Sequence, residues 1–367
     1  MPIASIPKGF SACSVFKDVQ GERTSTCRTL GGCSLVGDGR GDENIALHSM
    51  HTLWLREHNR IAGELRSLNR RWSGELVFQT ARKIVGAIWQ KAVYEEYLPR
   101  LVKINRYRQY NPNVDPSIAQ GFAAAAFRYG HSLVPNSFQQ NNRNFDPIAD
   151  PIPLQEAFFN REKINFYGIE PTMFGLVGNQ SNEVDNSFAK GIARQLFVRP
   201  GETFTYDLLA LNIQRGRDHG LPTYPAYRKL CGLSEINSFS DLRGVILPEA
   251  IRAFQRTYRN VDEIDLFAGG ISEIHVNGLE LGPTFGCIVG GQFEALRDGD
   301  RFFFENPGVF TSSQLASIKR TSFASVLCEN LKGIVSIQPQ ALLVPSTSNR
   351  RISCSRIPRL DLRPFRE

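Results

Sequence analysis

Several features that are scarce or missing limit what this chain can be. Its 367 residues include only 6 histidines, 3 methionines and 3 tryptophans. No apolar run approaches the roughly 18 residues that a membrane-spanning helix needs, so no membrane span is expected. The net charge is +7, but no block of lysines and arginines occurs. A mildly basic, soluble surface is therefore favoured over a nucleic-acid-binding one, and no nucleic-acid partner is expected.

The cysteines lack the spacing of common metal and redox motifs. There are 7 of them, and no two are arranged as Cys-x-x-Cys, which argues against zinc-finger and thioredoxin-like sites. Buried thiols and long-loop disulfides both fit such well-separated cysteines, and the odd number leaves at least one without a partner in this chain. The N-terminus has no charged segment followed by an apolar core, so it does not resemble a signal peptide. We expect either a chain not secreted as it stands or a start further upstream.

Apolar periodicity predicts a mainly α-helical fold. Apolar residues recur every three or four positions from Ile45 to Leu68, and a second such pattern runs from about Gly74 to Leu98, where Pro99 stops it. A third helix is predicted to begin at Asp115-Pro116, with Asp as N-cap and Pro at the first helical position. Shorter helices are predicted at 153–160, 183–196, 206–217, 222–230, 247–258 and 313–323. Loops are predicted at 1–43 and 139–154, and short strands at 302–304 and 342–344.

Two tempting signals lie between residues 36 and 65. Arg40-Gly41-Asp42 has the form of a cell-adhesion tripeptide, and His48, His51 and His58 fall on nearly one face of the first predicted helix. A zinc site would need further imidazole or carboxylate ligands turned to the same point. Histidines packed into a helix interface are the favoured interpretation of this pattern.

Two other segments concentrate groups that carry chemistry. In AAAAFRYGHSLVPNSF (123–138), Arg128 lies about one helical turn before His131, and four alanines would let a flat ligand approach the backbone. An imidazole beside a guanidinium suits a haem, whose iron and propionates these groups would bind, although a histidine packed in the core is the common alternative. In ALNIQRGRDHGLPTYPAYR (210–228), Asn212, Arg215 and neighbouring charges need either mutual ion pairs or an anionic ligand.

Six motifs in order resemble the animal haem peroxidase family. They are GDGRGDEN, SMHTLWLREHNRIA, ARKIVGAIWQKAVYEEYLP, FRYGHSLVP, LNIQRGRDHGLPTY and LRDGDRFFFEN, and the resemblance runs from about Cys33 to the C-terminus. The resemblance implies an irregular segment over 1–32 and a partial haem peroxidase domain over 33–367. That domain would be mainly α-helical with few short strands, and its N-terminal distal part would be missing.

The resemblance also implies roles for particular residues. His131 matches the proximal axial ligand of the haem iron, and Asn212 matches the residue that accepts a hydrogen bond from its other ring nitrogen. The residues matching those that approach the propionates are Arg128 and Arg215. Two further matches lie in the first motif: Arg40 corresponds to the distal catalytic arginine and Glu43 to the glutamate that can form an ester with haem b. Asn44 stands where some relatives have a methionine bonded to a haem vinyl group, so that link is not expected here. Arg40 would then point into the haem pocket, making the adhesion tripeptide a coincidence.

Cysteine pairing and location are implied in the same way. Cys231 matches a partner of Cys287, Cys328 matches a partner of Cys354, and Cys33 matches half of a third disulfide, with Cys27 or Cys13 as its partner. Such disulfides favour an extracellular or secretory-lumen setting. Full-length relatives also have a calcium-binding loop and a distal histidine in an N-terminal segment, and neither is found here. That missing segment is a candidate partner of this chain.

The predicted function is a haem-dependent peroxidase that uses hydrogen peroxide to oxidise a halide, a pseudohalide or a phenolic donor. The alternative is a haem-binding fragment or interaction module, catalytically impaired because it lacks the distal histidine. An adhesion protein using Arg40-Gly41-Asp42 is the least favoured interpretation.

Overall fold

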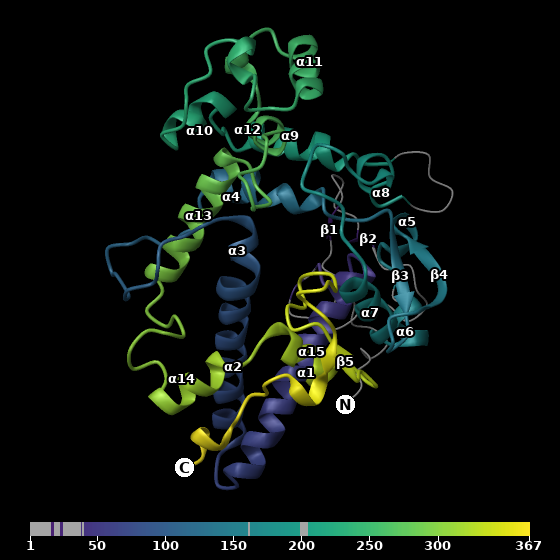
Figure 1. Ribbon diagram of the computed structural model, residues 1–367, viewed down its shortest axis with the longest axis vertical. Coiled ribbons are helices and arrows are strands. Elements are labelled where there is room, and N and C mark those ends of the chain that lie inside the picture. The colour runs from purple at the N-terminus through teal and green to yellow at the C-terminus, as the bar shows by residue number, and fades with distance from the viewer. Residues whose placement is uncertain (1–15, 18–22, 25–37, 39, 161, 199–204) are drawn as a thin grey trace. The chain divides into compact units, whose positions relative to one another are not determined.

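A computed structural model describes residues 16–17, 23–24, 38, 40–160, 162–198 and 205–367. Helices dominate the described chain, with few short strands (Figure 1), so the prediction of a mainly α-helical fold is confirmed. Contacts divide the chain into two compact units. The first unit comprises Met1–Ile88, Asn136–Gln180 and Ala316–Glu367, and the second comprises Trp89–Pro135 and Ser181–Leu315.

The first unit is built on α1 (Ile45–Leu68), which has the predicted bounds. Asn44 is its N-cap, and its side chain accepts a hydrogen bond from the backbone N–H of Leu47. One stripe of the helix is buried and packs against α7 (Glu170–Gly178) and α15 (Phe323–Asn330). Leu55 is one of the apolar residues of this helix, but it is exposed in the structure. The remaining helices of this unit are α5 (Leu154–Ala157), α6 (Glu162–Tyr167), η5 (Cys354–Arg356) and η6 (Arg363–Phe365).

The segment predicted as a loop at 139–154 contains a β-hairpin instead. Strand β3 (Ser137–Asn141) pairs antiparallel with β4 (Pro147–Pro153). The Asn142 side chain accepts hydrogen bonds from two backbone N–H groups of the connecting turn. Gly175 of α7 lies so close to the backbone of β3 that a Cβ there would stand 2.0 Å from the Gln139 carbonyl oxygen. This packing, which no alternating sequence pattern reveals, stabilises the hairpin.

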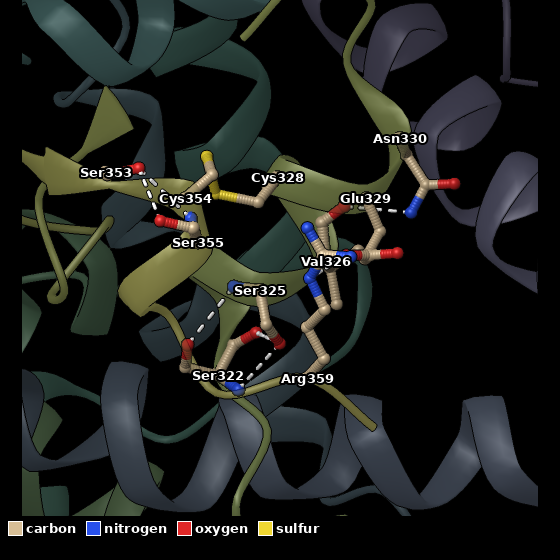
Figure 2. Close-up of a disulfide and its surroundings, with 10 residues drawn as sticks. All are labelled: Ser322, Ser325, Val326, Cys328, Glu329, Asn330, Ser353, Cys354, Ser355 and Arg359. Atoms are coloured by element: carbon tan, nitrogen blue, oxygen red, sulfur yellow. Dashed lines mark hydrogen bonds and ion pairs between the residues drawn. A yellow bond between two sulfur atoms is a disulfide. The ribbon is translucent and has the colours of Figure 1, made fainter. Parts of the chain in front are cut away.

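A disulfide links the C-terminal elements of the first unit (Figure 2). Cys328 of α15 is bonded to Cys354, which follows β6 (Ile352–Ser353), and β6 pairs with β5 (Ser336–Ile337). Figure 2 also shows Ser322 and Ser325 at the start of α15, where they form a capping box. The predicted pairing of these two cysteines is confirmed. Cys13, Cys27 and Cys33 lie outside the described residues.

The second unit packs around α13 (Pro283–Asp298), a helix that the sequence analysis missed. Three glycines weaken its helical signal, and two of them, Gly286 and Gly290, face Val102. The predicted disulfide between Cys231 and Cys287 joins α13 to the end of α10 and is confirmed. The other helices of this unit are η1 (Ala92–Tyr97), α3 (Leu98–Leu101), α4 (Gln120–Ala124), η2 (Ala126–His131), α8 (Lys190–Ala193), α9 (Leu208–Asp218), α10 (Tyr224–Leu230), η3 (Phe239–Leu242), α11 (Pro248–Thr257), η4 (Val261–Glu263) and α12 (Leu266–Ile271).

Two helices cross the division between the units: α2 (Gly74–Lys91) and α14 (Ser312–Lys319). The predicted second helix therefore starts as expected, but helical structure continues through the π-helical η1 and past Pro99 to Leu101. A π-helix shifts the register of side chains, and it is found often at functional sites.

Three local predictions are wrong. The helix expected from Asp115 begins only at Gln120, because the Asp115 side chain accepts the Ser117 N–H in a turn. The strands expected at 302–304 and 342–344 are turns. Phe303 and Phe304 are buried by packing and form no ladder. Within the part of the chain that the structure describes, no helix is long and apolar enough to cross a membrane.

Candidate functional site

His131 ends η2, a short 3-10 helix of the second unit. The helix starts after Ala125, whose backbone angles interrupt α4, and the backbone and hydroxyl of Ser132 both bond the Tyr129 carbonyl to close the turn. Burial, and then the charge of Arg128, lowers the pKa of His131 from 6.5 to about 4. The imidazole is therefore neutral at pH 7 and has a lone pair that can bind a metal.

Asn212, in α9 (Leu208–Asp218), is hydrogen-bonded to this histidine. Asp207 caps α9 by accepting the N–H groups of Leu209 and Ala210, and Asn212 faces inward with no exposed surface. Its amide nitrogen lies 2.9 Å from Nδ1 of His131. Its amide oxygen accepts a hydrogen bond of 2.9 Å from Nη1 of Arg128. The structure thus brings together three residues that the sequence analysis selected from separate segments.

The orientation of the amide differs from the expected one. The resemblance implied that the oxygen of Asn212 would face the imidazole, whereas here the nitrogen does. Arg128 accounts for the difference. A guanidinium has donors only, so the amide atom that it contacts must be the oxygen.

Arg128 lies near this histidine, and Arg215 lies near Arg128. Burial, and then the charge of Arg215, lowers the pKa of Arg128, while Arg215 itself is exposed. In the described ranges, neither arginine forms an ion pair with a carboxylate. Two like charges without counter-ions favour an anionic ligand between them.

The alanines before His131 do not form the expected open surface. Ala124, Ala125 and Ala126 are buried, and only Ala123 is exposed. Ala125 and Ala126 pack into the apolar core of the second unit, where α4 and η2 contact α13. Small side chains here serve close packing between helices.

The remaining predicted residues, Arg40 and Glu43, belong to the first unit. The Arg40 side chain is 73% exposed and pairs with Asp38 at 2.7 Å. Burial raises the pKa of Glu43. The backbone of Glu43 is fixed, because its carbonyl accepts the N–H of Phe159.

The adhesion interpretation of Arg40-Gly41-Asp42 is contradicted by the burial of its aspartate. The Asp42 carboxylate is only 11% exposed and lies 2.7 Å from Nδ1 of the buried His48. The premise that the arginine would be hidden is also unsupported, since Arg40 is the exposed member of the tripeptide.

Two structural contacts near the predicted residues were missed. Asn44 is the N-cap of α1, and an Asn directly before a periodic apolar run could have indicated this. The hydroxyl of Tyr129 is hydrogen-bonded to that of Tyr97 in η1. Nothing in the local sequence indicates this pair, because the two residues meet only through packing within the second unit.

Comparison with known proteins identifies the class to which this helical chain belongs. The chain belongs to the animal haem peroxidase family, whose sequence model matches residues 13–342. It is 42% identical to the human peroxidasin homolog over 345 residues, which cover 91% of this chain and 23% of that protein. It is 37% identical to rat thyroid peroxidase over 348 residues, 91% of this chain and 38% of that one.

Solved structures of similar fold include a member of the peroxidases. Peroxidase A from Dictyostelium discoideum superimposes with a TM-score of 0.77 at 34% identity, covering 84% of this chain and 59% of that one. A fatty acid α-dioxygenase from Arabidopsis thaliana, at a TM-score of 0.64 and 19% identity, shares the fold. The chain thus spans well under two thirds of the length of these relatives.

The family implies a haem cofactor, and the second unit suits one in two respects. Nδ1 of the imidazole is bonded to Asn212, so a metal would bind at Nε2, which has a lone pair only when the ring proton is on Nδ1. Arg128 and Arg215 offer cationic partners for carboxylates.

Proposed function

We propose that this chain is part of a haem-dependent peroxidase that uses hydrogen peroxide to oxidise a halide, a pseudohalide or a phenolic donor. The single observation that carries the proposal is the contact of Asn212 with His131, because a hydrogen-bonded partner on the other ring nitrogen is what orients a histidine ligand. When bound, the haem iron would supply the redox chemistry with peroxide.

The protein residues would act as follows. His131 would ligate the iron through Nε2, and Asn212 would fix the orientation of the imidazole. Arg128 and Arg215 would pair with the propionates. Arg40 would stabilise negative charge developing on the peroxide, but it is always protonated and cannot take the peroxide proton. Glu43 would be the residue that forms an ester with a haem methyl, with hydrogen peroxide as the oxidant that removes the two electrons this bond requires.

The peroxide proton needs a base that we do not assign within this chain. His48 is bound to Asp42, and His219 is bound to Gln120. We therefore propose that residues 33–367 form a partial peroxidase domain. The segment 1–32, expected to be irregular, lies outside the described residues except for the paired strands β1 (Phe16–Lys17) and β2 (Arg23–Thr24). The distal histidine and the calcium loop would be supplied by a further N-terminal segment. The two disulfides support an extracellular or secretory-lumen location.

A second candidate is a haem-binding module without turnover. It is favoured by the pairing of the exposed Arg40 with Asp38, which leaves this guanidinium committed to a neighbouring carboxylate. A Soret band together with oxidation of a donor by peroxide would support the peroxidase, and a Soret band without oxidation would support the module.

The ligand assignment is tested by two matched variants. His131→Ala should abolish the Soret band or greatly weaken haem retention, because the iron loses its axial nitrogen. His51→Ala should leave the band largely intact, since that half-buried histidine of α1 is assigned to packing. Equal haem binding by the two variants would refute the role of His131.

A further inference from the structure

The contacts among Arg128, Asn212 and His131 determine where the imidazole proton lies. A guanidinium carries five N–H donors and no acceptor, so the amide atom 2.9 Å from Nη1 of Arg128 must be the oxygen. The amide nitrogen then points to the other side and lies 2.9 Å from Nδ1 of His131. Because an NH₂ group only donates, Nδ1 must be the acceptor, and the proton of the neutral ring is on Nε2.

This tautomer is the wrong one for binding iron. A histidine that ligates iron through Nε2 needs a lone pair on that nitrogen and a proton on Nδ1, which then donates to an acceptor. Here the acceptor of Asn212, its amide oxygen, is held by Arg128. The proposed ligand is therefore blocked by its own positioning residue as long as Arg128 keeps this contact.

We propose that Arg128 is a latch on the proximal histidine. Without haem, Arg128 holds the Asn212 amide in the orientation that protonates Nε2. When a carboxylate of the porphyrin draws the guanidinium away, the amide turns by half a rotation and its oxygen accepts a proton on Nδ1. The ring loses a proton from Nε2 to water and gains one from water on Nδ1, so its charge does not change. This inference rests on the proposed binding of haem at His131.

The surroundings of Asn212 determine which end of its amide faces Arg128 and which faces His131. The side chain is fully buried, so its amide cannot replace a lost partner with bulk water. While Arg128 keeps its contact, only the present orientation is satisfied, because the turned amide would place its NH₂ group against another donor. Arg128 is held from a second direction, because its Nε donates to the Ala123 carbonyl at 3.0 Å. Repulsion from Arg215 opposes this arrangement, and an anion between the two arginines would relieve it.

The test is the tautomer of His131, read from long-range ¹H–¹⁵N correlations of its imidazole in the haem-free protein at neutral pH. The wild-type protein should contain mainly the Nε2–H form. Arg128→Met removes the donor that holds the amide oxygen, so the amide is free to turn and the share of the Nδ1–H form should rise above that of the wild type. Arg215→Met is the matched control, because it removes a nearby positive charge but no hydrogen bond, and its tautomer should match that of the wild type.

A second variant keeps the inference testable if Arg128→Met does not fold. Asn212→Asp places acceptors on both sides, so Arg128 can stay in place while Nδ1–H becomes the major form. The latch is overturned if wild-type His131 already carries its proton on Nδ1, or if both folded variants keep the wild-type tautomer.

Zinc protoporphyrin, which is diamagnetic and carries both propionates, tests the release step. Binding to the wild-type protein should convert His131 to the Nδ1–H form with zinc on Nε2. Binding at His131 without a proton on Nδ1 would overturn the latch alone. Failure of the porphyrin to bind would instead refute the proposed function, and the haem-free tautomer would still report on Arg128.

Discussion

Arg228 and Glu273 form an ion pair of 2.7 Å in which both side chains are almost completely buried. Glu273 also accepts hydrogen bonds from the hydroxyls of Tyr224 and Thr284 and from the Thr284 N–H. The carboxylate thereby links α10, α13 and the end of α12 in the second unit. Such a pair stabilises only when every member is satisfied, so removal of one partner is far more costly than removal of an exposed pair.

Glu273→Gln should lower the free energy of unfolding by about 3–5 kcal/mol, because it leaves the Arg228 charge buried without its counter-ion. The measurement is urea unfolding of the purified chain. Glu235→Gln is the control, since Glu235 pairs with Lys229 where both side chains are more than half exposed, and its loss should cost about 1 kcal/mol or less. Similar losses in the two variants would contradict the assignment of the buried pair.

The pKa of His131 predicts how the stability of the haem-free protein varies with pH. The folded-state pKa of about 4 lies below the usual histidine value of 6.5, so between these values this group binds more protons in the unfolded chain than in the folded one. Stability should therefore be complete above about pH 6.5 and fall as the pH drops towards 4, by at most about 3 kcal/mol. His131→Gln should show a smaller decrease over this range in urea titrations. A decrease identical to that of the wild type would show that other groups cause it.

Both disulfides should stabilise the folded chain, and the disulfide that closes the longer loop should contribute more. Cys231 and Cys287 are 56 residues apart, and Cys328 and Cys354 are 26 apart. The entropy of loop closure predicts losses of about 4 and about 3.5 kcal/mol for the respective double serine variants. Urea unfolding with and without reductant measures each loss. A reductant that leaves wild-type stability unchanged would contradict this account.

The chain alone should react slowly with peroxide. An acid–base group at the distal site typically contributes about 10²- to 10⁴-fold, and Arg40 cannot supply it. We expect the haem-loaded chain to react roughly two or more orders of magnitude more slowly than a full-length relative such as the Dictyostelium peroxidase. Addition of an N-terminal peroxidase segment should restore the rate. Stopped-flow absorbance measures both, and a full rate from the chain alone would mean that it contains a base not assigned here.

Local sequence predicted those parts of the molecule that local interactions determine. The periodic apolar residues of α1 and its preceding Asn44 specify the helix and its start, and both bounds agree with the structure. Composition and spacing singled out the segments that contain His131, Arg128 and Asn212, and the family resemblance supplied their roles and the two cysteine pairs. The contacts among the three residues agree with that selection, although their roles with haem remain proposals.

Tertiary contacts decided the rest. Helix α13 contains three glycines that argue against a helix in isolation, and it is stabilised by packing around it. The hairpin β3–β4 lacks alternation and depends on Gly175 lying against its backbone. The orientation of the Asn212 amide depends on a donor 84 residues earlier in the chain. No local pattern specifies that contact, because an amide has a donor and an acceptor of nearly the same shape, and only the partners assembled by folding distinguish them.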